Sequence, residues 1–148
     1  MLDCNYFMRE ALREARKAFE KDEVPVGAVV VWDKGGDIIA RAHNMVEQLK
    51  DVTAHAEMLA FTAAANAIGG KYLSECTLYV TLEPCTMCAG ASFWTQIGGI
   101  VYGATDPKRG FSCIATSGNI LHPKTTVTSG VLADECTELL KLFFEKKR

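Results

Sequence analysis

The feature that most constrains this fold is the alternation of apolar runs with two different periods along the 148 residues. Between Tyr6 and Lys21, apolar residues recur at spacings of four, three and four, the pattern of a helix with one buried face: Met8, Leu12, Ala15 and Phe19. The next run, VPVGAVVVW, is rich in β-branched residues, and Pro25 disfavours its continuation as a helix. With the turn sequence DKGGD and the run IIARAH behind it, this segment predicts a β-hairpin.

Helical and strand patterns continue to alternate after the hairpin. The alanine-rich stretch DVTAHAEMLAFTAAANAIGG has a candidate N-cap at Thr53 and a stop at Gly69, which predicts a helix. CTLYVTLE predicts a strand, and Pro84 is suited to the first turn of a helix formed by CTMCAGASFWTQI. GGIVYGAT predicts another strand, TTVTSG a weak edge strand, and VLADECTELLKLFFEKK a terminal helix. Its inward positions are expected to be Leu132, Cys136, Leu139, Leu140 and Phe143.

This alternation predicts an α/β protein with three α/β/α layers and a mixed central sheet of about five strands. A single domain over residues 1–148 is expected, because chains of about 100–200 residues usually form one core. The order of the strands does not follow from the sequence. Residues 106–125 form a long connection, which is either a functional loop or contains a short element.

Charge and hydropathy limit which binding partners and which cellular compartment are expected. The net charge is −2 and the pI about 5.9, so RNA would have to bind at a local patch. The terminal residues Lys146, Lys147 and Arg148 offer such a patch, or simply a solvated helix end. The chain begins without a signal-like segment and contains no apolar run long enough for a bilayer, which predicts a soluble cytoplasmic protein without a membrane partner.

Cys85 and Cys88 belong to a set of six cysteines that we expect to be free thiols or metal ligands in this setting. Three residues apart at a helix start, their sulfurs would face one ion, and the helix dipole favours their thiolate forms. Two thiolates and one imidazole suit zinc. A redox dithiol and a buried pair with no ligand are the alternatives.

His55 and Glu57 decide what kind of site this would be. His55 near another helix start can converge on the same ion, although a histidine alone is more often an ordinary core or surface group. Glu57 is either a dipole partner in a first helical turn or a carboxylate beside the metal. Three protein ligands leave the fourth position of zinc for water, and an adjacent carboxylate can carry that water's protons. The sequence therefore predicts a catalytic site.

The segments HAE and PCTMC resemble the paired signature of zinc-dependent nucleobase deaminases. The resemblance extends over nearly the whole chain to the bacterial tRNA-specific adenosine deaminases, within the cytidine and deoxycytidylate deaminase superfamily. The segments that carry it are VPVGAVVV, HNM, TAHAEM, TLYVTLEPCTMCAGA, IVYGATD, LHP, GVLADEC and the late FF. It implies zinc held by His55, Cys85 and Cys88, proton transfer by Glu57, and hydrolysis of adenosine to inosine at the wobble position of a tRNA anticodon loop.

The resemblance also implies three substrate contacts. Asn44 would hydrogen-bond the target base, Asp106 would lie near the sugar and backbone of a neighbouring nucleotide, and Phe144 would pack against the anticodon loop. Without the resemblance, Asn44 and Asp106 are turn residues and Phe144 is core. The chain has Thr105 where the family usually has arginine, so Lys108 or Arg109 would have to replace one phosphate contact.

A homodimer is also implied, and Phe93 and Trp94 are candidate contact residues or, alternatively, core. Two other functions remain open from the sequence. One is a deaminase of a free base or nucleoside, such as guanine, cytosine or cytidine. The other is a non-catalytic zinc module that binds RNA or a protein partner, against which Glu57 argues, because such a module needs no proton carrier.

Overall fold

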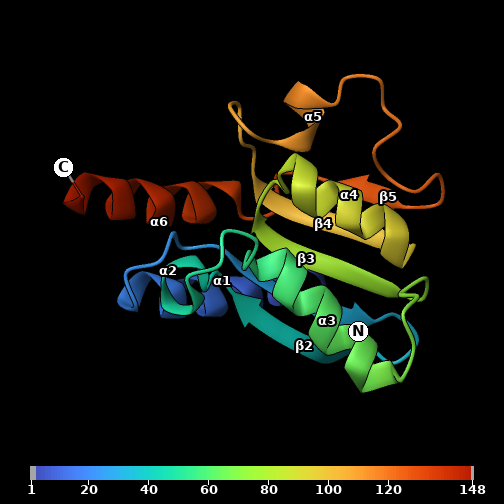
Figure 1. Cartoon of the computed structure of the whole chain (residues 1–148). Helices are drawn as coiled ribbons and strands as arrows, with labels where there is room; N and C mark the ends of the chain where they lie inside the picture. The colour runs from blue at the N-terminus through green and yellow to red at the C-terminus, as the bar shows by residue number, and fades with distance from the viewer. Residues whose placement is uncertain (1–2, 148) are drawn as a thin grey trace.

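A five-stranded sheet in the order β2-β1-β3-β4-β5 forms the centre of the computed structural model, which describes residues 3–147 (Figure 1). Strand β1 pairs antiparallel with both β2 and β3, whereas the β3–β4 and β4–β5 pairs are parallel. The predicted mixed sheet is therefore confirmed. The strands are β1 (Gly27–Trp32), β2 (Asp37–His43), β3 (Cys76–Leu82), β4 (Gly99–Ala104) and β5 (Thr126–Thr128).

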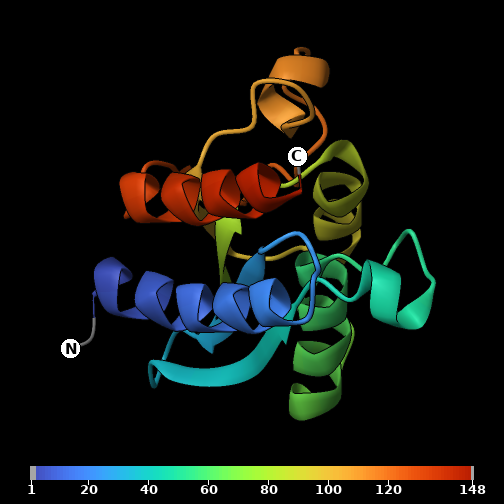
Figure 2. The ribbon, with the colours of Figure 1, turned by 90° about the vertical axis from the view of Figure 1, so that its left-hand side faces the viewer.

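Helices cover both faces of this sheet, as the predicted three-layer fold requires. Helices α3 and α4 lie on one face, and α1 and α6 run side by side on the other (Figures 1 and 2). The helices are α1 (Cys4–Glu20), α2 (Val46–Leu49), α3 (Ala56–Ile68), α4 (Thr86–Thr95), α5 (Phe111–Ile114) and α6 (Ala133–Lys146). Within residues 3–147, none of them is long and apolar enough to cross a membrane.

Strand β1 is buried on both sides, which explains its unbroken apolar sequence. Ala28 and Val30 face the core under α3 and α4, whereas Val29 and Val31 face the core under α1. At Gly27 the contact with α1 is so close that a Cβ would lie 2.1 Å from the carbonyl oxygen of Ala11. Glycine is therefore required for α1 to pack directly on the sheet.

The parallel unit β3–α4–β4 positions the functional segments. Because neighbouring parallel strands end at the same edge of a sheet, the residues that follow β3 and β4 meet there. These are residues 83–85, which lead into α4, and residues 105–112, which lead into α5. The backbone N–H of Glu83 donates to the carbonyl oxygen of Ala104 at 2.8 Å, which joins the first segment to the end of β4, where the second begins.

The structure differs from the sequence prediction at several element boundaries. Helix α3 begins at Ala56 rather than just after Thr53, because Asp51 Oδ1 accepts hydrogen bonds from the N–H and hydroxyl of Thr53 at 2.8 and 2.7 Å and makes a turn there. Pro84 lies before α4, whose N-cap is Cys85. The long connection over 106–125 does contain a short element, α5, whereas α2 was not predicted.

Candidate active site

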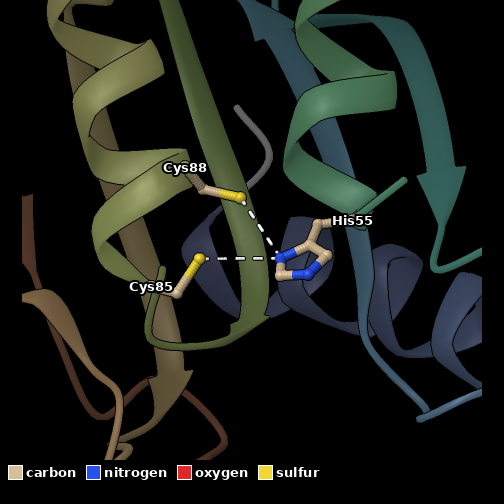
Figure 3. A group of neighbouring side chains, drawn as sticks. All are labelled: His55, Cys85 and Cys88. Carbon is tan, nitrogen blue, oxygen red and sulfur yellow. Dashed lines mark hydrogen bonds between the residues drawn. The ribbon is translucent and has the colours of Figure 1, made fainter. Parts of the chain in front are cut away.

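His55, Cys85 and Cys88 point toward one another between the starts of α3 and α4 (Figure 3). His55 and Cys85 are the N-cap residues of the two helices, and Cys88 lies one turn further along α4. His55 Nδ1 lies 3.6 Å from each of the two sulfurs, and the three candidate ligand atoms all lie within 4.8 Å of one another. Among residues 3–147, this is the group of histidine, cysteine or acidic side chains arranged to hold a metal.

The spacing of these atoms fits zinc. Tetrahedral angles, with zinc bonds of about 2.0 Å to nitrogen and 2.3 Å to sulfur, place the two ligand atoms about 3.5 Å apart. The observed separations of 3.6 Å agree with that value. A closed site would need a fourth protein ligand, but Cys113 and His43, which lie on other elements, are not members of the group. Three ligands leave a fourth tetrahedral position free, which is the arrangement of catalytic rather than structural zinc sites.

The surroundings of the group favour thiolate at Cys85 and thiol at Cys88. Hydrogen bonds from the Cys88 thiol and from His55 lower the pKa of Cys85 to about 4. Cys88 has a raised pKa, because its thiol donates to the Cys85 sulfur and is itself buried. The hydrogen bond with Cys85 raises the pKa of His55. Without a cation the three groups therefore retain a shared proton, which a divalent metal would displace on binding.

Glu57 lies in the first turn of α3 and is 4% exposed. Its burial, strengthened by the charge of Cys85, raises its pKa to about 7. A carboxyl group with a pKa near neutrality can both accept and return a proton, as general acid–base catalysis requires. Its burial beside the ligands, where it lines the same pocket as His55 and Cys85, separates it from an ordinary exposed acid at a helix start.

One pocket of about 790 Å³ contains six of the seven predicted site residues, the exception being the more deeply buried Cys88. Asn44 lies in its wall and is 8% exposed. Asn44 Oδ1 accepts a hydrogen bond of 2.8 Å from the backbone N–H of Ala56 at the start of α3. Because the amide oxygen is used for this bond, the amide NH₂ is left for a ligand. The remaining predicted residues in the pocket are His55, Glu57, Cys85, Asp106 and Phe144.

Asp106 and Phe144 lie at the rim of this pocket. Asp106 Oδ1 accepts hydrogen bonds from the backbone N–H groups of Lys108 and Arg109 at 3.1 and 3.0 Å. Asp106 therefore does form a turn, as one alternative from the sequence held, and also lines the pocket. Phe144 is 49% exposed, which contradicts the alternative that it is core, whereas its neighbour Phe143 is 4% exposed.

A second hollow of about 1040 Å³ shares Asp106, Arg109 and Phe144 with the pocket and extends it between α6 and residues 105–109. Its charged lining is mainly basic, with Lys108, Arg109, Lys141 and Lys147 against the acidic Asp106 and Glu145. Thr105 lies in its wall, within four residues of Lys108 and Arg109.

The predicted basic patch at the C-terminus is partly neutralised. Lys147 Nζ lies 2.5 Å from Asp22 Oδ2, and Lys146 Nζ lies 3.9 Å from Asp22 Oδ1. The hydrogen bond from Lys147 lowers the pKa of Asp22. Arg148 lies outside the described residues.

Sequence reasoning missed two buried acids in the pocket wall. Glu23 accepts hydrogen bonds from the backbone N–H groups of Glu47 and Gln48 at 3.0 and 2.7 Å, and so holds α2 beside the pocket. Glu83 does the same for residues 106–112 on the opposite side. Each lies close to a proline just outside a strand: Glu23 in EVP before β1, and Glu83 in LEP after β3. An acidic residue beside proline at a strand boundary is the signal that the sequence offered.

Taken together, an open His–Cys–Cys group and a buried carboxylate in a pocket at the carboxyl edge of the sheet define a zinc-dependent hydrolase. Comparison with known proteins agrees. The zinc-binding region of cytidine and deoxycytidylate deaminases matches residues 1–104. A tRNA-specific adenosine deaminase from Aquifex aeolicus is 49% identical over 97% of this chain and 95% of its own length.

Solved structures of deaminases share this fold. A structure from a study of A-to-I editing by tRNA deaminases at the wobble position superposes with a TM-score of 0.83 and 45% identity, over 90% of this chain and 98% of that one. A guanine deaminase from Nitrosomonas europaea superposes with a TM-score of 0.82 and 26% identity, over 97% of this chain and 85% of its own. The chain belongs to the tRNA-specific adenosine deaminase family, within the zinc-dependent cytidine and deoxycytidylate deaminases.

Proposed function

We propose that this protein hydrolyses adenosine to inosine at the wobble position of a tRNA anticodon loop. The observation that carries the proposal is the single pocket in which Asn44, Glu57 and Asp106 meet the metal-binding group. A loop nucleotide suits this pocket, because an unstacked base can enter it at a lower cost than a base inside a helix.

In this proposal His55, Cys85 and Cys88 hold zinc. When bound, zinc supplies a Lewis acid that makes water nucleophilic near neutral pH. Glu57 takes a proton from the attacking water and delivers it to the ring nitrogen beside the attacked carbon. It then takes the remaining proton of the added hydroxyl group and passes it to the amino group, which departs as ammonia. Its position supports this role, since burial raises the pKa of this carboxyl group and places it in the same pocket as the metal-binding residues.

Asn44 and Asp106 would orient the nucleotide. The Asn44 amide is fixed by its bond to the start of α3, so its NH₂ can donate to an acceptor on the base edge. Asp106 uses Oδ1 for its turn, which leaves Oδ2 for a ribose hydroxyl of a neighbouring nucleotide. The exposed ring of Phe144 would stack or pack against the loop at the rim.

The hollow beside the pocket supports an RNA substrate. The phosphates on either side of the target nucleotide would follow its basic lining, and Lys108 or Arg109 would supply the charge that Thr105 does not. Lys147 would contribute only by exchanging its partner Asp22 for a phosphate. Because the basic side chains are gathered locally, a chain with a net charge of −2 can still bind RNA there.

We further propose that residues 1–148 act as one deaminase domain in the cytoplasm and form a homodimer. Trp94 supports the dimer, because this large side chain on α4 is 77% exposed, as apolar contact residues are before assembly. Phe93 is half-buried beside it, with ring centroids 5.3 Å apart. Measuring the mass by light scattering tests the assembly, and a monomer would contradict it.

The experiment that tests the substrate compares four compounds under the same conditions: an anticodon stem-loop with adenosine at the wobble position, free adenosine, guanine and cytosine. Ammonia release and inosine formation are measured with zinc-loaded protein. We expect inosine in the stem-loop alone. Rapid turnover of guanine with an unchanged stem-loop would favour the second candidate, a free-base deaminase, which the similarity to a guanine deaminase fold makes the main alternative.

A further inference from the structure

The buried side chain of Glu83 occupies the junction between β3 and α4, two residues before Cys85, and is 3% exposed. Its two oxygens accept three hydrogen bonds from one segment of the chain. Glu83 Oε1 accepts from the backbone N–H of Asp106 at 3.0 Å. Glu83 Oε2 accepts from the N–H and hydroxyl of Ser112 at 3.0 and 2.6 Å. Within residues 3–147, no ion pair includes this carboxylate, so the loop donors alone compensate its burial.

The same loop folds tightly onto the junction through its backbone. Phe111 N–H donates to the carbonyl oxygen of Pro84 at 2.9 Å, and Gly110 forms a bridge with Cys85. A Cβ at Gly110 would lie 2.3 Å from Glu83 Oε1, so only glycine lets the loop approach the carboxylate this closely.

These contacts connect the metal-binding junction to the pocket rim. Glu83 fixes the backbone of Asp106, and the Asp106 carboxylate in turn fixes the backbone of Arg109. Asp106 and Arg109 line both the pocket and the basic hollow beside it. A shift of the loop would therefore move an acidic and a basic side chain relative to Cys85.

We propose that Glu83 is a positioning residue that holds the rim segment 106–112 in register with the zinc ligands and so sets the affinity for nucleotides next to the target base. This inference rests on the proposed function, because it assigns the rim to RNA binding. Glu83 itself touches no reacting atom in this account. Its effect on the reaction passes through the loop.

Glu83→Gln tests the inference with almost no change in volume. The amide NH₂ replaces one carboxylate oxygen and cannot accept a hydrogen bond from the backbone N–H that it faces. That bond to the loop is lost, and its N–H is left unpaired. We expect KM for the stem-loop to rise about tenfold with little change in kcat, since one buried hydrogen bond typically governs an effect of that size. The zinc content should stay at that of the wild type.

The salt dependence of KM provides a readout that simple destabilisation would not change. In the proposed complex Arg109 contacts a phosphate of the RNA. If Glu83→Gln breaks that contact, the slope of log KM against log salt should fall by about one. Arg109→Ala removes the same charge directly and should give the same change in slope. A variant that is merely less stable would lose active protein, which lowers the apparent kcat and leaves KM and the slope unchanged.

Two further variants separate this contact from general effects of substitution. Gly110→Ala places a methyl group 2.3 Å from Glu83 Oε1 and 2.6 Å from the carbonyl oxygen of Asp106, so it separates the loop from the carboxylate and should reproduce the Glu83→Gln phenotype. Gly70→Ala, where an added Cβ meets nothing within 4 Å, should behave as wild type. Ser112→Ala removes one of the three hydrogen bonds and should give a smaller rise in KM.

Hydrogen exchange measures the loop without RNA turnover. In zinc-loaded Glu83→Gln, peptides that contain residues 106–112 should exchange faster than in the wild type, and peptides from α1 should not. Unchanged exchange in this segment, or faster exchange with an unchanged KM, would overturn the role of Glu83. A wild type that forms no inosine would instead refute the proposed function, and the rim's role in RNA binding with it.

Discussion

The floor and the rim of the pocket are built in different ways. The floor consists of His55, Glu57, Cys85 and Cys88 at the starts of two helices that pack on the sheet, and Glu57 and Cys88 are almost fully buried. The rim consists of the loop over residues 105–112, held by hydrogen bonds to the buried carboxylate of Glu83, and of the exposed side of α6. The floor carries the metal-binding group and Glu57, whereas the rim carries side chains that would contact the RNA. Changes in the floor should therefore affect metal binding and turnover, and changes in the rim should affect affinity for RNA.

Cys88→Ser has the largest expected effect, because it removes a ligand from the floor. Serine is a poor zinc ligand, so zinc should fall well below one per chain and deaminase activity should be lost with it. Metal analysis after dialysis measures the first and ammonia release the second. Cys76→Ser is the matched control, since Cys76 is equally buried but lies in β3, outside the metal group.

The control should lose stability but keep its zinc. If Cys88→Ser retained full zinc, the assignment of the ligands would be wrong. If Cys76→Ser lost zinc as well, the loss would reflect unfolding and not the removal of a zinc ligand. The expected difference between a cysteine of the floor and a buried cysteine outside it would then be wrong.

Phe143 and Phe144 are neighbours on α6, but one is buried and the other is exposed. Phe143 is 4% exposed and packs against Phe19 with ring centroids 6.1 Å apart. Phe143→Ala should therefore reduce the free energy of unfolding by about 3–5 kcal/mol. Phe144→Ala should cost less than about 1 kcal/mol, because that ring is half exposed, yet it should raise KM for the stem-loop. Urea denaturation and steady-state kinetics separate the two, and equal stability losses would contradict the assignment of Phe144 to the rim.

Glu14, on the far face of the sheet, gives the smallest expected effect. Burial alone would raise its pKa, but hydrogen bonds from Lys17 and His43, at 2.7 and 3.2 Å, outweigh burial and lower it. The carboxylate therefore stabilises the fold above its ordinary pKa of 4.5, and this contribution is lost as the pH falls through the lowered value. Glu14→Gln should be less stable by about 1–2 kcal/mol near neutral pH.

Urea denaturation at a series of pH values measures this difference, which should shrink as the pH falls below 4.5. The zinc content should be unaffected, because α1 carries none of the metal group. A difference that grew toward acid would show that Glu14 does not stabilise the fold as a carboxylate.

The sequence predicted the floor better than the rim for a physical reason. The spacing of Cys85 and Cys88 is local, so one helix turn determines how the two sulfurs face each other. The convergence of His55 needed two helix starts to meet. The backward lean of first-turn side chains made this possible and the resemblance implied it, but only the structure shows His55 beside the two sulfurs. The layers and the mixed sheet were predicted because the spacing of apolar residues along the chain indicates which faces of the helices and strands are buried.

Contacts between distant segments were not accessible in this way. The bonds of Glu83 reach residues 23 and 29 positions away, and nothing in their spacing marks them. The Asn44 amide, which caps α3 twelve residues later, was interpreted only through the resemblance. Trp94 was left as either core or contact residue, and its 77% exposure excludes the core.

The central claim is that the buried carboxyl group of Glu57 moves the protons in the floor while the zinc ligands stay intact. The most direct test is the rate of inosine formation in the wobble stem-loop, per bound zinc, for wild type and Glu57→Ala. We expect equal zinc and a rate about 10²–10⁴-fold lower in the variant, the usual contribution of general acid–base catalysis. A variant that keeps the wild-type rate with full zinc would contradict it.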